Sequence, residues 1–247
     1  MTLLRFYLDL CKEPVERPWE GRGYLLIDEA QDVTRMQAAL IREFAKRRGF
    51  AIRVYGDPNQ QISHEYDAPL FSDLAPQDMT VLEGTPGYKR VPRQIAELAW
   101  GLDPSMPHWE SWANLDEPGE IRPFERPIYP VFKGISMSES RARTRTCSMA
   151  SPKSQIALSP RAACNAGWDL ERNPVFCTIH AAKGWEAETV TVQRWQPGRH
   201  QARIRRGEIT AIRQLFTALT RCKRTLYIHQ EMLELCKLRS TELASSA

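Results

Sequence analysis

The chain has 247 residues, of which 42% are hydrophobic and 26% charged, and this composition excludes a fibrous repeat or wholesale disorder. No stretch approaches the roughly 18–20 apolar residues of a membrane span, and the N-terminus shows no secretory signal. The formal charge is −7 over residues 1–120 and +11 over residues 121–247. The basic second half indicates either a surface for polyanions or an ordinary solvated face.

The six cysteines predict reduced thiols. They are scattered along the chain, and the absence of any Cys-x-x-Cys pair argues against a zinc ribbon. Free thiols are typical of the cytosol. We therefore expect a cytoplasmic protein without a membrane partner.

The first hundred residues alternate between strand and helix patterns. The apolar run Tyr24-Leu25-Leu26-Ile27 predicts a strand buried on both faces, which places it centrally in a parallel sheet. A helix that stops at Gly49, a second strand and a second helix beginning near Pro92 follow, over residues 34–48, 50–55 and 92–99. This order predicts an α/β layered fold.

The second half is less regular. Residues 101–130 are rich in proline and tryptophan and predict a connection between domains, with a strand near Ile121. Residues 134–160 fit either a basic loop or a degraded core segment. Beyond them we expect strands, a helix and a terminal helix, at residues 175–179, 189–192, 208–219, 225–228 and from Gln230. The resulting domains are 1–104 and 105–247.

Two acids follow the first predicted strand. Asp28 and Glu29 open the string Asp28-Glu29-Ala30-Gln31-Asp32, at the carboxyl end of a strand, where open α/β sheets bind ligands. Asp28 is suited to hold Mg²⁺, and Glu29 to orient and deprotonate an attacking water. The alternative is that the pair caps a helix.

A second polar string follows the next predicted strand. In Gly56-Asp57-Pro58-Asn59-Gln60, the neutral amide of Gln60 is able to donate and accept at once, which suits contact with a terminal phosphate or a water. By itself, Gly-Asp-Pro-Asn is an ordinary turn. Its position one strand after the acidic pair favours a shared site.

Together the two strings resemble motifs II and III of the UvrD/Rep-like superfamily 1 DNA helicases. Further segments resemble the Tyr-Arg-x-Pro segment, motif V and motif VI in family order, at residues 88–95, 178–186 and 216–222. The resemblance spans residues 24–228. It implies two RecA-like domains with parallel sheets, the first truncated at its N-terminus, and a bacterial or viral setting.

The resemblance also implies a reaction. ATP and Mg²⁺ would lie between the two domains, with Asp28 holding the metal and Glu29 and Gln60 serving the attacking water and the terminal phosphate. Arg90 and Arg221 would neutralise charge on the transferred phosphoryl group, with Arg221 as the arginine finger. The activity implied is ATP-dependent movement, 3′ to 5′, along single-stranded or partly duplex DNA.

Five more residues receive roles in the same way. Gly184 and Glu186 match the nucleotide-binding part of motif V, and Thr178 and His180 match its contacts with single-stranded DNA. Without the motif, Thr178 is an ordinary strand residue and His180 a turn histidine. Motif III departs from the family pattern, because Ser63 stands at the usual tyrosine position. Tyr66 is the candidate to stack on a base instead.

The phosphate loop of the ATP-using members is not found. No Gly-x-x-x-x-Gly-Lys-Thr/Ser string (Walker A, motif I) occurs in these 247 residues. We therefore expect the isolated chain to lack ATPase activity and to be a split half or truncated form that needs the loop in trans, from a second polypeptide. The alternative is a non-catalytic nucleic-acid-binding or regulatory remnant of a helicase.

Overall fold

The computed structural model describes residues 23–57, 60–62, 90–103, 108–125, 134–138, 174–195 and 197–244. The chain divides into two compact units, Met1–Glu83 and Gly84–Ala247. This division falls before residue 104, where the sequence places the boundary. The reason is that helix α4 (Arg93–Trp100) packs with β5 (Glu120–Phe124), α9 (Ile209–Leu219) and α10 (Gln230–Ala244) of the second unit.

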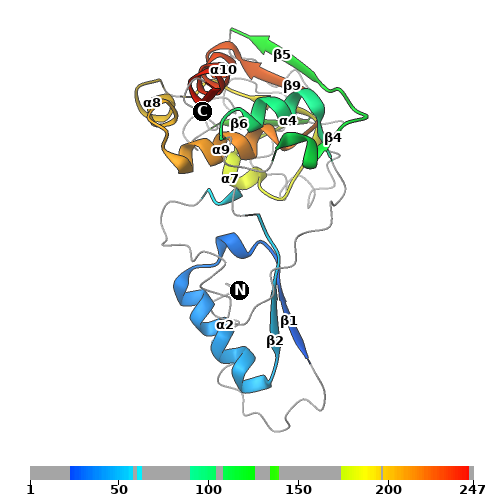
Figure 1. Ribbon diagram of the computed structural model, residues 1–247, viewed down its shortest axis with the longest axis vertical. Coiled ribbons are helices and arrows are strands. Elements are labelled where there is room, and N and C mark those ends of the chain that lie inside the picture. The colour runs from blue at the N-terminus through cyan, green and yellow to red at the C-terminus, as the bar shows by residue number, and fades with distance from the viewer. Residues whose placement is uncertain are drawn as a thin grey trace, which may run out of the picture. The chain divides into compact units, whose positions relative to one another are not determined.

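The first unit contains a strand–helix–strand arrangement. Strands β1 (Tyr24–Ile27) and β2 (Ala51–Val54) are parallel, and α2 (Arg35–Arg48) joins them (Figure 1). Parallel neighbours need such a crossover, since a tight turn reverses the chain. Both strands and the helix lie where the sequence predicts them.

Both ends of α2 are capped by residues that the sequence supplies. At the N-terminus the Oγ1 of Thr34 accepts from the Gln37 N–H at 3.2 Å, and the Gln37 Oε1 accepts from the Thr34 N–H at 2.8 Å. This reciprocal pair is a capping box. At the C-terminus Gly49 adopts a φ of 68°, the left-handed conformation that favours glycine.

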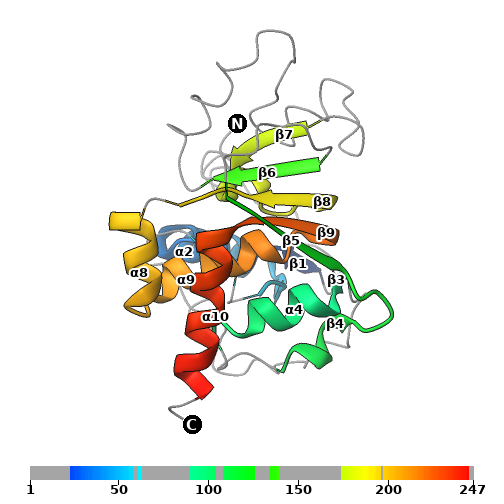
Figure 2. The same cartoon turned by 90° about the horizontal axis from the view of Figure 1, so that it is seen from above.

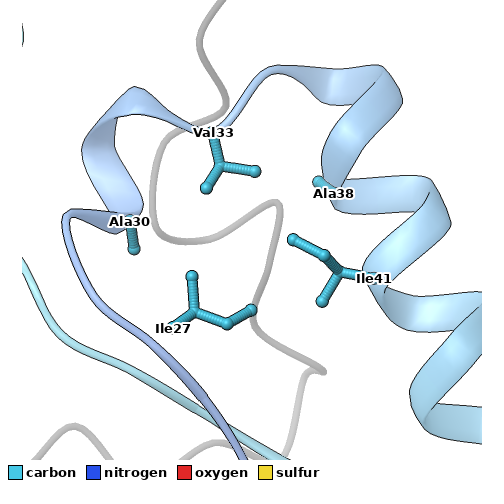
Figure 3. Packing of buried hydrophobic residues seen from close by; sticks show 5 residues of the cluster. All are labelled: Ile27, Ala30, Val33, Ala38 and Ile41. Atoms are coloured by element: carbon cyan, nitrogen blue, oxygen red, sulfur yellow. The ribbon is translucent and has the colours of Figure 1, made fainter. Parts of the chain in front are cut away.

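The core of this unit lies between α2 and one face of the strands. Its buried members are Ile27, Ala30, Val33, Ala38 and Ile41, which point toward one another in Figure 3. Leu25 and Ile52 pack against them. These residues come from β1, β2, α2 and the 3-10 turn at Ala30–Asp32, so the core fixes the direction in which the chain leaves β1.

The prediction that β1 is buried on both faces is wrong. Tyr24 is 50% exposed and Leu26 is 63% exposed, whereas Ile27 is buried. The guanidinium of Arg53 lies 4.3 Å from the centre of the Tyr24 ring on this outer face. Only the face toward α2 is a core face among the described residues, because a single helix covers a single side of the strand pair.

The second unit is built on a five-stranded parallel sheet. Its strand order is β5–β9–β8–β6–β7, as Figure 2 shows. The remaining strands are β6 (Gly134–Ser138), β7 (Pro174–Thr178), β8 (Ala187–Val192) and β9 (Cys222–His229). Helix α9 contacts β8 and β9, and α10 contacts β5 and β9. The strands expected near residues 121, 175–179, 189–192 and 225–228 are confirmed.

Short elements complete the second unit. Strands β3 (Val91–Pro92) and β4 (Ala113–Asn114) are parallel, so the stretch expected to connect two domains instead belongs to this unit. Strand β6 takes part of the segment that has no clear pattern in the sequence. The short helix α7 (Ile179–Ala182), the π-helical turn at Pro197–Gln201 and α8 (Ala202–Arg205) carry no sequence signal strong enough to predict. No helix among the described residues has the length and apolar character needed to cross a membrane.

Candidate functional site

The two polar strings of the first unit meet at one edge of its sheet. Strands β1 and β2 run in parallel, so residues 28–29 and 55–57 leave the same end. The Ala30 N–H donates to the carbonyl of Tyr55 at 2.9 Å, and the Tyr55 N–H donates to the carbonyl of Ile27 at 2.8 Å. The predicted proximity of the two strings is therefore found in the structure.

A chain of side-chain hydrogen bonds links the two strings. The buried amide of Gln31 donates from Nε2 to the Glu29 carboxylate and accepts on Oε1 from the Asp57 N–H at 3.2 Å. The Asp57 Oδ2 in turn accepts from the Gln60 Nε2 at 3.0 Å. We did not single out Gln31 from the sequence, although it stands inside the same string as Glu29.

The backbone of Glu29 has an uncommon conformation. Its φ of 53° and ψ of 41° lie in the left-handed region, the one case among the described non-glycine residues. Such a conformation costs about 1–3 kcal/mol and is found preferentially at functional sites. It turns the chain sharply from β1 into the 3-10 turn, so that Glu29 points back toward Gln31.

Asp28 fits one part of a magnesium site. Its side chain is exposed, and its Oδ1 accepts from the Glu29 N–H at 2.9 Å. Mg²⁺ prefers oxygen ligands and commonly takes one or two carboxylates together with waters and substrate phosphates. The described residues contain no cluster of three metal-ligating side chains. Asp28 would therefore supply one ligand, and a metal bound there would need further oxygen ligands from waters or a phosphate.

Charged side chains gather at the start of β8 in the second unit. Arg90 Nη1 lies 3.2 Å from Glu186 Oε1, and Lys223 Nζ lies 4.0 Å from Glu186 Oε2. The sequence suggested Arg90 and Glu186 as site residues, and the structure brings them together. Lys223 was missed, although it follows motif VI by one residue on the adjacent strand.

Arg221 lies in the interior of the second unit. Its side chain is 1% exposed, its Nε donates to the carbonyl of Thr217 at 3.2 Å, and its Nη2 lies 3.5 Å from Thr220 Oγ1. Its own carbonyl accepts from the Ala187 N–H at 3.1 Å, which places its backbone beside that of Glu186. The guanidinium itself is held against the last turn of α9, where the partial charge of the helix end is negative.

The remaining residues of motif V have distinct local roles. Thr178 caps α7, because its Oγ1 accepts from the Ala181 N–H at 3.3 Å, and His180 is exposed on that helix. Gly184 has a φ of 77°, and no atom lies within 4 Å of the place where a Cβ would stand. Thr178 is the last residue of β7, whereas Glu186 directly precedes β8, so in this parallel sheet Thr178 lies at the carboxyl end of the strands and Glu186 at the amino end. Tyr66 lies outside the described residues.

Comparison with known proteins shows that this chain is similar to helicases. Residues 8–64 match the family model of the UvrD/REP helicase N-terminal domain. No curated protein matches. The arterivirus nonstructural protein 10, a helicase, in its complex with DNA has 18% sequence identity and a TM-score of 0.50, and the match covers 90% of this chain and 43% of that one.

Two further solved structures are similar at lower scores. The same arterivirus helicase without DNA has 17% identity and a TM-score of 0.49, over 90% of this chain and 43% of that one. The C-terminal domain of a possible DNA helicase from Lactobacillus plantarum has 12% identity and a TM-score of 0.39, over 58% and 87%. This chain thus spans less than half the length of the arterivirus protein.

The fold is therefore similar to that of the arterivirus helicase solved with DNA. More particularly, residues 8–64 match the family model of the UvrD/REP helicase N-terminal domain, which confirms the resemblance read from the sequence. The matched segment contains both polar strings of the first unit. A helicase family implies the use of a nucleotide and a metal by its members.

Proposed function

We propose that this chain is part of an ATP-dependent helicase that moves 3′ to 5′ along single-stranded DNA in the cytoplasm. The observation that carries the proposal is the convergence of Asp28 and Glu29 with Asp57 and Gln60 at one edge of the first unit, closed by the Ala30–Tyr55 backbone hydrogen bond of 2.9 Å. The carboxyl ends of parallel strands are the place where open α/β sheets bind ligands. The family match over residues 8–64 supports the same assignment.

The chemistry of these side chains suits phosphoryl transfer to water. Asp28 would hold Mg²⁺, which supplies charge neutralisation on the phosphates, and Glu29 would orient the attacking water and take its proton. Gln60 would contact the terminal phosphate. Arg90 and Arg221 would stabilise the negative charge that develops on the transferred group.

We assign the remaining residues to nucleotide and DNA contacts. Gly184 and Glu186 would bind the nucleotide. Thr178 and His180 would contact the phosphates of single-stranded or partly duplex DNA, with Tyr66 as a candidate for base stacking. The solved arterivirus helicase with DNA, although only 18% identical, supports a nucleic-acid partner for this fold.

The phosphate loop would come from outside these 247 residues, because they contain no Gly-x-x-x-x-Gly-Lys-Thr/Ser string. We therefore expect the purified chain to show no appreciable ATP turnover, with or without single-stranded DNA. Addition of a polypeptide that carries the missing first half of the domain should restore turnover, and Glu29→Gln should abolish it. Steady turnover by the chain alone that Glu29→Gln removes would refute the need for a loop in trans.

DNA binding has a test of its own. Each contact with a phosphate releases counterions, so affinity for an oligo-dT strand should fall by roughly tenfold or more between about 50 and 200 mM salt. His180→Ala should weaken binding, whereas His108→Ala, which removes another exposed histidine of the same unit, should leave it unchanged. A flat salt response, or no binding at the lower concentration, would contradict the proposal.

One observation favours the alternative, a non-catalytic nucleic-acid-binding or regulatory remnant. The Arg221 residue is 1% exposed and its guanidinium contacts Thr217 and Thr220, so it is not presented to solvent. If the chain binds DNA but never gains turnover when the missing half-domain is added, this second function is the correct one.

A further inference from the structure

Among the described residues of the first unit, Gln31 is the one whose polar side chain is buried. It is 3% exposed, and it lies directly beneath the site edge, between the turn after β1 and the turn after β2. A buried amide is costly unless both of its ends are hydrogen-bonded. Here Nε2 donates to the Glu29 carboxylate and Oε1 accepts from the Asp57 N–H at 3.2 Å.

The two contacts together select an amide at this position. A carboxylate in place of the amide would face the Glu29 carboxylate, and two like charges repel at that distance. A lysine has no acceptor for the Asp57 N–H, and a leucine has neither donor nor acceptor. Of these four side chains, only the neutral amide donates to one partner and accepts from the other.

The connection continues from Asp57 to Gln60. The Gln60 side chain donates to Asp57 Oδ2 at 3.0 Å, and the Gln60 N–H donates to the Asp57 carbonyl at 3.0 Å. Gln60 is therefore held at two points by Asp57, and the Asp57 N–H is in turn bound by Gln31. One unbroken path of hydrogen bonds runs from the Glu29 carboxylate to the Gln60 amide.

We propose that Gln31 is a positioning residue that couples the Glu29 carboxylate to the Gln60 side chain. Through this coupling, a change at Glu29 is transmitted to Gln60 across the gap between the two strand ends. The inference rests on the proposed function for its importance to catalysis, since Glu29 serves the water and Gln60 the terminal phosphate. The hydrogen-bond path itself exists in the chain without nucleotide, so it is testable without activity.

The test uses the full chain without nucleotide, with ¹⁵N in the glutamine side-chain amides and the backbone. Shortening the acid by Glu29→Asp should shift the Gln60 side-chain amide resonance in an otherwise unchanged chain. In the Gln31→Leu background the same Glu29→Asp change should leave the Gln60 resonance where it is. Gln31→Leu alone should raise the exchange rate of the Asp57 N–H by roughly tenfold, because that N–H loses its acceptor.

A second variant separates positioning from packing. In Gln31→Glu the new carboxylate would face the Glu29 carboxylate, and two like charges repel. The Gln60 resonance should therefore be displaced further in Gln31→Glu than in Gln31→Leu, which removes the amide without adding a charge. A role in packing alone predicts displacements of similar size in the two variants.

Gln37→Leu is the matched control. It removes a glutamine of the same unit that accepts one backbone N–H, in the cap of α2, but that has no part in the path. It should leave the Gln60 and Asp57 signals unchanged. The proposal is overturned if Glu29→Asp fails to move Gln60, or moves it equally with and without Gln31. If Glu29→Asp moves the Gln60 resonance only when Gln31 is present, but the assembled helicase shows no ATP turnover, the result counts against the proposed function alone.

Discussion

The guanidinium of Arg90 lies 3.2 Å from the carboxylate of Glu186, although 96 positions separate the two residues in the chain. Lys223 stands on the other side of the same carboxylate, with its Nζ 4.0 Å from Glu186 Oε2. All three side chains are partly exposed. A phosphate that approaches Arg90 must therefore compete with Glu186 for it.

This competition predicts the effect of Glu186→Gln on anion binding. Removing the carboxylate charge leaves Arg90 and Lys223 without their shared counter-charge, so the affinity for inorganic tripolyphosphate should rise roughly two- to fivefold at low salt. Isothermal titration calorimetry measures the change. Glu188→Gln, which removes an exposed acid on β8, is the control and should have less effect. An unchanged or lower affinity in Glu186→Gln would show that Arg90 is not available to phosphate.

Arg221→Ala should destabilise the second unit. The change leaves a cavity and removes a donor from the carbonyl of Thr217, which together cost roughly 2–4 kcal/mol. Urea unfolding followed by tryptophan fluorescence reports the free energy of unfolding. Arg224→Ala, at an exposed position on β9, should stay within about 0.5 kcal/mol of the original chain. Equal effects of the two variants would mean that Arg221 is not buried in solution.

Gly119→Ala and Gly184→Ala form a matched pair in the same unit. Both glycines have a positive φ, 71° and 77°, so both substitutions carry a backbone cost of about 1–2 kcal/mol. A Cβ at Gly119 would also stand 2.4 Å from the Cβ of Pro92, whereas a Cβ at Gly184 meets no atom within 4 Å. Gly119→Ala should therefore lower the thermal midpoint clearly more than Gly184→Ala. The close approach at Pro92 is refuted if the two midpoints agree.

The buried thiols predict slow alkylation and a loss of stability at high pH. Burial raises the pKa of Cys177, Cys222 and Cys236 from 9.0 to about 12. Because the unfolded thiols ionise first, their contribution to stability is fully present below pH 9 and is lost as the pH rises from 9 toward 12.

Mass spectrometry after iodoacetamide treatment at pH 8 tests this directly. The three thiols should remain unmodified in the native chain and react once the chain is unfolded in urea. Rapid modification of any of them without denaturant would contradict the burial of that thiol.

Much of the fold follows from local sequence patterns. The helix at α2 is predictable because its apolar spacing and the Gly49 stop act within the segment itself, and the capping pair Thr34 and Gln37 reinforces its start. The strands β7, β8 and β9 are likewise predictable, because each contains a short strand-like run of apolar and β-branched residues. The exposed outer face of β1 was not predictable, since an apolar strand pattern does not say how many layers cover it.

The sequence alone determined which residues are candidates for chemistry and in what order they occur, because the motif strings are contiguous in the chain. Only the tertiary structure decided how they are used. It closed the path from Glu29 through Gln31 to Gln60, brought Lys223 to the Arg90–Glu186 pair, and directed the Arg221 side chain inward. These relationships depend on strand register and on which residues of neighbouring strands face one another, and a linear pattern carries neither.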